Sequence, residues 1–96
     1  MARQARGRAP REEEHSTLTV TGVDGKGNPF QEETQTIDIS ESGVSFYLKT
    51  PIWMDSHLTL QIQSSSLFGA GSIMKAKVVR IQSGNPRGQL IGARFD

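Results

Sequence analysis

Apolar and polar residues alternate in six separate stretches of the chain, each bounded by turn-forming residues. The clearest stretch places Val44, Phe46 and Leu48 on one face and Ser45 and Tyr47 on the other. Strict alternation is typical of a strand with one buried face, and no window keeps the three-to-four spacing of an amphipathic helix. The predicted strands cover residues 15–23, 30–39, 44–49, 58–63, 72–81 and 89–95.

Clusters of glycine, proline, asparagine and aspartate separate these stretches, most clearly at residues 24–29 and 83–88. Strands at such short spacing predict a meandering antiparallel sheet, and so small a sheet covers its edges best by closing. We therefore predict an all-β fold, a small six-stranded antiparallel β-barrel. The stretch 30–39 is polar at first and apolar at Ile37 and Ile39, which favours an outer or edge strand whose last residues enter the core.

Length and composition limit the class of protein. A chain of 96 residues forms one small domain. It has no cysteine, which excludes a disulfide framework, a thiolate nucleophile and a cysteine zinc site. No stretch is apolar for long enough to span a membrane as a helix. We expect a cytoplasmic protein without membrane insertion.

Charge is distributed unevenly along the chain. Residues 1–11 contain four arginines and no acid, residues 12–14 are three glutamates, and the remainder carries as many acids as bases. So polar a start buries too little apolar surface to offset the entropy of ordering. The sequence therefore predicts a flexible, arginine-rich arm with its acidic run over residues 1–14, followed by a single barrel domain over residues 15–96.

The chain offers few residues for catalysis or metal binding. Its two histidines, His15 and His57, each stand at a predicted strand start without a neighbouring nucleophile and orienting group. Asp24, Asp38 and Asp55 stand singly in different turns, so no metal site is predicted. No glycine-rich turn is followed by the helix that a phosphate loop needs. We predict a protein that is not an enzyme and has no cofactor.

One constellation of residues has the pattern of a known family. Residues 38–43 read D-x-S-x-x-G between two predicted strands and follow an arginine arm, and Ile91, Gly92 and Phe95 form an I-G-x-x-F closing strand. In this arrangement the chain resembles a PilZ domain over its whole length. The resemblance implies a six-stranded barrel that binds cyclic di-GMP, a bacterial second messenger, and passes the signal to a protein partner.

The resemblance assigns the arm a ligand-binding role. Cyclic di-GMP carries two phosphates and two guanines, and a guanidinium pairs well with phosphate oxygens and with the O6 and N7 acceptors of guanine. The family's arm arginines correspond here to Arg11 and, less closely, to Arg8 and Arg6. Strict R-x-x-x-R is absent, because Gly7 stands four residues before Arg11.

The resemblance assigns the turn residues to the ligand as well. Asp38 is expected to accept hydrogen bonds from the Watson–Crick edge of a guanine. Ser40 is expected to place a hydroxyl or N–H near a ligand oxygen, and Gly43 to permit the tight turn. Without the family resemblance, the residues by themselves favour an ordinary Asx or Ser turn, with Gly43 at a positive φ.

Two other functions remain open from the sequence. The altered arm and the three glutamates beside it favour, as the alternative, a PilZ-type barrel that no longer binds the nucleotide and acts as a protein–protein adaptor. A basic arm on a small barrel is also compatible with nucleic-acid binding, but the neutral body lacks a basic groove, so we disfavour it. We expect a monomer or weak dimer.

Overall fold

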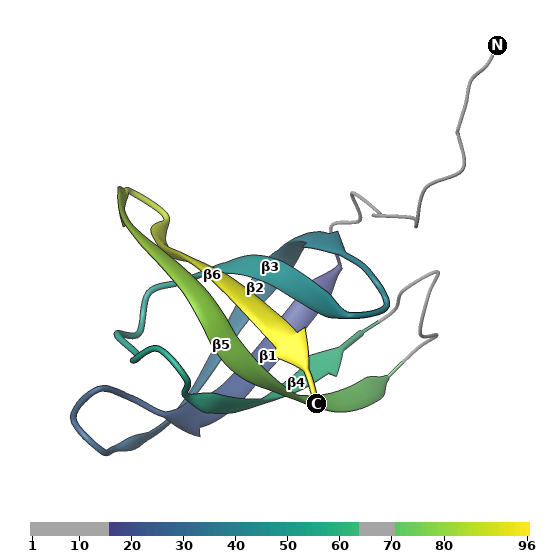
Figure 1. Ribbon diagram of the computed structural model, residues 1–96, viewed down its shortest axis with the longest axis horizontal. Coiled ribbons are helices and arrows are strands. Elements are labelled where there is room, and N and C mark those ends of the chain that lie inside the picture. Colours follow the sequence, from purple (N-terminus) through teal and green to yellow (C-terminus); the bar gives the residue numbers. More distant parts are fainter. Residues whose placement is uncertain (1–15, 64–70) are drawn as a thin grey trace, which may run out of the picture.

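The computed structural model describes residues 16–63 and 71–96, which form six strands (Figure 1). The strands are β1 (Thr17–Val23), β2 (Pro29–Ile39), β3 (Gly43–Leu48), β4 (His57–Ile62), β5 (Ser72–Asn85) and β6 (Gly88–Phe95). The described residues contain no helix. The predicted flexible arm, residues 1–14, lies outside the described residues, as does the predicted strand start at residue 15.

The strands close into an antiparallel barrel in the order β1-β2-β3-β6-β5-β4, with β4 returning to β1. This confirms the predicted fold class. The predicted meander is wrong, however, because β3 pairs with β6 and not with β4. Residues 49–56 form a connection too long for a tight hairpin and containing Pro51, so β3 and β4 need not be neighbours. In Figure 1, β5 and β6 run side by side and their hairpin projects beyond the barrel.

The connection between β3 and β4 is held by a carboxylate from β2. Glu32 accepts hydrogen bonds from the Lys49 N–H (2.8 Å), the Thr50 N–H (3.0 Å) and the Thr50 hydroxyl (2.7 Å). Further along, the Pro51 carbonyl accepts from the Gly25 N–H (2.9 Å) in the turn between β1 and β2. These bonds satisfy backbone groups that a hairpin ladder would otherwise pair.

The barrel interior is filled by apolar side chains from all six strands and from the β3–β4 connection. Its buried members are Leu18, Val20, Ile39, Val44, Phe46, Leu48, Ile52, Leu58, Leu60, Ile62, Ala76, Val78, Ile91 and Ala93. In β1, β3, β4 and β6, alternate apolar residues point inward, as the sequence pattern predicts. The opposite faces of β2, β3, β6 and β5 therefore form a continuous outer surface.

Two strands, β2 and β5, depart from simple alternation: β2 has one register shift with β3, and β5 has two with β6, at Val78/Arg80 and at Gln82/Asn85. The β2–β3 register shifts between Thr36 and Asp38, which makes Ile37 the extra residue of a bulge. The buried residues of β2 accordingly change from an even position, Thr36, to an odd one, Ile39. Ile37 is only half-buried, so the expectation that it enters the core with Ile39 is wrong. The shift leaves Asp38 on the outer face.

Strand β5 contains a corresponding irregularity. Its register with β6 shifts between Val78 and Arg80, so Val79 is the extra residue. Val78 is fully buried, whereas Arg80 is exposed although it stands two residues further on. Without the bulge, alternation would direct both side chains into the core.

Candidate ligand-binding site

The turn between β2 and β3 is closed by its own serines. The Ser40 N–H donates to the Gly43 carbonyl (2.9 Å), and the Ser42 N–H donates to the Ser40 hydroxyl (3.3 Å). The two serine hydroxyls share a hydrogen bond of 3.1 Å. The Ser42 carbonyl accepts from the Phe95 N–H (2.9 Å), which fixes the turn to the end of β6. The turn thus presents two hydroxyls from a well-anchored backbone.

Gly43 is needed in this turn for packing. Its φ is not in the positive region, which among the described glycines is occupied by Gly27, Gly71, Gly84 and Gly88. The interpretation of Gly43 as a positive-φ residue is therefore wrong. A Cβ at this position would collide with the Ala93 carbonyl oxygen of β6. Glycine allows β3 and β6 to approach each other beside the turn.

One row of residues crosses four strands on the outer face. Asp38 of β2 pairs with Ser45 of β3, Ser45 with Gly92 of β6, and Gly92 with Arg80 of β5. An acid and an arginine thus stand at opposite ends of the row, separated by two small residues. Both bulges contribute, because each directs its charged residue outward. Asp38 itself is half-buried.

The small residues of this row form the floor of a surface cleft of about 220 Å³. The turn between β2 and β3 borders one side, and the paired strands β5 and β6 border the other. The lining residues are Ser40, Ser42, Gly43, Val44, Ser45, Val79, Arg80, Gly92, Ala93 and Arg94. Two predicted site residues, Ser40 and Gly43, therefore line one cleft, and Asp38 adjoins it through Ser45.

Two arginines of this cleft were not predicted from the sequence. Arg80 and Arg94 are exposed, and the Arg80 guanidinium lies against Gly92, where a Cβ would come within 3.3 Å of it. Arg94 stands directly across the β3–β6 ladder from Gly43. Their place beside the turn depends on long-range strand pairing and on the Val79 bulge, which sequence spacing does not report. The only signal available was Arg94 within the I-G-x-x-F stretch.

Ser16, the first residue that the structure describes, lies close to this face. The Ser16 N–H donates to the Thr36 hydroxyl, and the Thr36 N–H donates to the Ser16 carbonyl, both at 2.9 Å. Thr36 lies two residues before Asp38 on β2. The predicted arm residues Arg6, Arg8 and Arg11 lie outside the described residues.

A second groove lies further along the outer face, towards the β5–β6 hairpin. Its volume is about 470 Å³, and its lining residues are Thr34, Gln35, Thr36, Ile37, Tyr47 and Arg87. The Arg87 guanidinium lies 5.7 Å from the centre of the Tyr47 ring, and Asn85 hydrogen-bonds the Tyr47 hydroxyl at 3.3 Å. The Tyr47 face is therefore already occupied by a cation.

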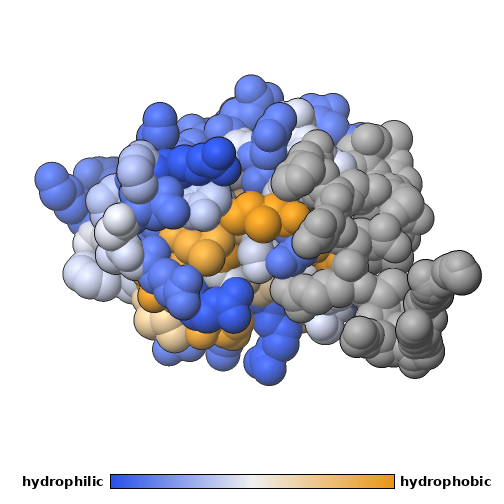
Figure 2. Space-filling view, turned by 90° about the horizontal axis from the view of Figure 1, so that it is seen from above, coloured by the Kyte–Doolittle hydropathy of each residue, from blue (hydrophilic) through white to orange (hydrophobic). Residues whose placement is uncertain are grey.

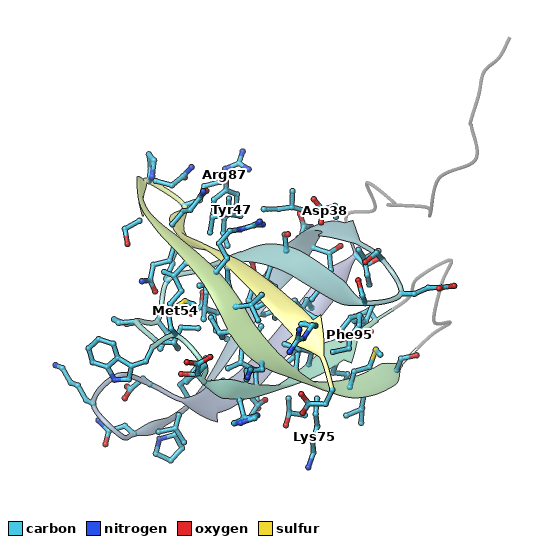
Figure 3. All side chains as sticks on the ribbon, in the orientation of Figure 1. Asp38, Tyr47, Met54, Lys75, Arg87 and Phe95 are labelled. Atoms are coloured by element: carbon cyan, nitrogen blue, oxygen red, sulfur yellow. The ribbon has the colours of Figure 1, made fainter. Side chains whose placement is uncertain are left out.

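The figures show how these groups are arranged. Figure 3 places Asp38, Tyr47 and Arg87 along one side of the barrel and Lys75 on the opposite side. Figure 2 looks onto the side with Asp38, and shows exposed apolar side chains in its middle, framed by hydrophilic ones. This face therefore combines apolar surface with charged groups.

Comparison with known families identifies the fold and its motif. The sequence matches the PilZ domain over residues 5–96. The chain belongs to the PilZ domain family. In this PilZ domain the D-x-S-x-x-G motif is the β2–β3 turn, and the closing I-G-x-x-F motif is the end of β6. The predicted family is thereby confirmed. Among curated proteins, none matches the sequence significantly.

Two solved structures share the fold of this PilZ domain. The K. pneumonia MrkH–c-di-GMP complex matches with a TM-score of 0.60 and 19% identity, over 97% of this chain and 45% of that chain. MrkH in its apo state matches with a TM-score of 0.54 and 17% identity, over 99% of this chain and 44% of that chain. This chain spans less than half the length of either MrkH chain.

The described residues of the PilZ domain contain no group of three or more His, Cys, Asp or Glu side chains that could hold a metal ion. They also include no helix long and apolar enough to cross a membrane.

Proposed function

We propose that this PilZ domain is a non-enzymatic receptor for cyclic di-GMP that passes the signal to a protein partner. The family membership supports a receptor role, and one solved protein of the same fold, MrkH, was determined in complex with this nucleotide. The observation that carries the proposal is the cleft beside the β2–β3 turn. It brings hydroxyls and guanidinium groups together next to Asp38.

Each predicted turn residue has a role in this proposal. The Asp38 carboxylate, on the outer face, accepts from the N1 and N2 donors of a guanine. The Ser40 hydroxyl, at the cleft wall, donates to a ligand oxygen. Gly43 contributes by keeping β3 close to β6, which leaves the cleft floor open for the ligand. None of these roles requires a bond to form or break.

The arm can reach this site. Arg11 stands five positions before Ser16, and a chain of that length spans at most about 17 Å. Ser16 is hydrogen-bonded to Thr36 of β2. Asp38 lies two residues further along the same strand, a distance of about 7 Å. In the proposed complex Arg11, with Arg8 or Arg6, closes over the dinucleotide. Fixing the arm against the barrel changes the surface that a protein partner meets.

Titration calorimetry of the full chain with cyclic di-GMP tests the proposal. We expect heat that corresponds to one or two ligands per chain, and a large loss of affinity in Arg11→Ala and in Asp38→Ala. Lys26→Ala, which removes an exposed positive charge in the turn at the other end of β2 from Asp38, is the matched control and should bind normally. Absence of heat at high micromolar ligand would reject the receptor role.

Amide hydrogen exchange provides a second test that is specific to the arm. If cyclic di-GMP draws the arm onto the barrel, exchange over residues 1–14 should slow when the ligand is added. In Asp38→Ala, at the same ligand concentration, the slowing should be reduced. Unchanged exchange in a chain that binds the ligand would remove the arm from the proposal.

The adaptor function is the second candidate, and a different surface favours it. Trp53 and Met54 in the β3–β4 connection are 67% and 50% exposed, and Val23 at the end of β1 is 53% exposed. Trp53 also borders an apolar pocket of about 380 Å³ and donates a hydrogen bond to the Gly25 carbonyl (3.0 Å). Exposed aromatic and methionine side chains are enriched in protein interfaces. A failed nucleotide titration would favour this function.

A further inference from the structure

We propose that the phosphates of the dinucleotide are held by Arg80 and Arg94 of the barrel. The inference rests on the proposed function and deepens it, because it assigns the anion-binding part of the site to residues outside the arm and outside the D-x-S-x-x-G turn. It also accounts for a chain that lacks a strict R-x-x-x-R sequence, since two guanidinium groups are supplied by β5 and β6.

The first argument is the position of Arg80. The Val79 bulge directs this side chain outward, and the small Gly92 beside it leaves the guanidinium lying along the cleft. A regular β5 would place Arg80 on the core face, where a charge is costly to bury. Bulges often re-aim a side chain next to a functional site. The irregularity thus directs Arg80 towards the cleft, and on the inner face it sets Ile81 opposite Ile91, where Ile81 packs against the core.

The second argument is the chemistry of the cleft lining. Its polar side chains are Ser40, Ser42 and Ser45 together with the two arginines, and no acidic side chain lines it. Hydroxyl, backbone N–H and guanidinium donors are the groups that bind phosphate in proteins. Within the described residues, neither Arg80 nor Arg94 forms an ion pair with a carboxylate. Both positive charges are therefore available to an anion.

The third argument is the spacing across the sheet. Asp38 and Arg80 stand at the two ends of one row over four strands, which separates their backbones by about 14 Å. A guanine that bonds Asp38 at one end leaves the sugar–phosphate ring over the small residues Ser45 and Gly92, towards the arginines. The carboxylate thus meets the donors of the base, and the guanidinium groups meet the dianion.

The test compares four variants of the full chain by calorimetry with cyclic di-GMP. Loss of a charged hydrogen bond predicts that Arg80→Ala and Arg94→Ala each bind about ten- to hundred-fold more weakly than the wild type. Lys26→Ala loses the same charge at an exposed position in the β1–β2 turn, at the other end of β2 from Asp38, and should bind within about two-fold of the wild type. Arg80→Lys separates phosphate binding from recognition of a guanine edge, because lysine keeps the charge and loses the planar fork.

The outcomes distinguish this inference from the proposed function. Weak binding by both alanine variants, with most of the affinity kept in Arg80→Lys, supports phosphate binding. A wild type that binds while Arg80→Ala and Arg94→Ala match Lys26→Ala overturns the inference and leaves the receptor role standing. Arg80→Lys as weak as Arg80→Ala overturns the phosphate assignment. A wild type that does not bind overturns both proposals.

Discussion

Two glycines at the cleft are required for different physical reasons, although both stand in ordinary extended backbone. At Gly43 a Cβ would meet the Ala93 carbonyl, which belongs to the β6 backbone and cannot move without shifting the ladder. At Gly92 a Cβ would lie 3.3 Å from both the Cβ and the guanidinium of Arg80, and only the guanidinium can turn away. The first glycine maintains strand pairing, and the second shapes the surface of the cleft.

This difference predicts that alanine at Gly43 mainly lowers stability, whereas alanine at Gly92 mainly weakens nucleotide binding. Gly43→Ala should lower the free energy of unfolding by about 1–3 kcal/mol, because β3 and β6 must separate to admit the methyl group. Gly92→Ala should cost less, about 1 kcal/mol, because Arg80 needs to shift by only a few tenths of an ångström, yet it should weaken nucleotide binding. Urea denaturation measures the first effect and calorimetry the second. Equal losses of stability in the two variants would contradict this account.

Asp24 shows how a turn makes stability depend on pH. Its carboxylate accepts from the Asn28 N–H (2.9 Å) and the Lys26 N–H (2.8 Å), and these bonds, that to Asn28 first, hold the pKa of Asp24 below its ordinary value. A carboxyl with a lowered folded pKa stabilises the fold above its unfolded pKa, and that contribution is lost as the pH falls through the folded pKa.

Asp24→Ala should therefore be less stable than the wild type at neutral pH, and the difference should shrink in acid. Denaturation of both proteins across the acidic range measures it. Glu33→Ala provides the comparison, since Glu33 is an exposed acid for which the structure gives no hydrogen bond. A difference in stability between the wild type and Asp24→Ala that grows towards low pH would contradict a lowered pKa of Asp24 in the folded protein.

At the scale of the strand, the sequence indicates where the chain is extended but not where it is irregular. Alternation correctly locates all six strands, and it places Val44, Phe46 and Leu48 in the core. It does not reveal the bulges at Ile37 and Val79. An extra residue changes the face of the sheet to which the following side chains point, but the residue types of the strand stay the same. A bulge depends on the partner strand, and the partner is set by long-range pairing.

The β3–β4 connection allows a prediction at the same scale. Glu32 accepts three hydrogen bonds from Lys49 and Thr50, whereas Glu33 next to it faces solvent. Glu32→Ala should lower the free energy of unfolding by about 1–3 kcal/mol, because the donors of the connection lose their charged acceptor. Glu33→Ala should change it by less than about 0.5 kcal/mol. Chemical denaturation of both variants measures these changes. Equal stabilities of Glu32→Ala and Glu33→Ala would show that Glu32 does not stabilise the β3–β4 connection.

At the scale of the whole molecule, the site is assembled by a strand order that the sequence does not give. Local patterns predicted the barrel, and the D-x-S-x-x-G motif located Asp38, Ser40 and Gly43. The pairing of β3 with β6 brings residues more than forty positions apart into one ladder, and local periodicity does not report such a contact. Arg80 and Arg94 were missed for this reason. The motif identified one wall of the cleft, and the topology supplies the other.

A site built from exposed charges on a nearly neutral body should respond strongly to salt. Added salt shortens the Debye length from about 10 Å at 0.1 M to about 3 Å at 1 M, so attraction between the arginines and the dianion weakens. We expect the affinity for cyclic di-GMP to fall steadily across this range. Arg80→Ala should show a shallower dependence, because one charged contact is already absent, while Lys26→Ala should retain the wild-type slope. Calorimetry at a series of NaCl concentrations measures the slopes, and identical slopes in all three proteins would place the phosphates away from Arg80.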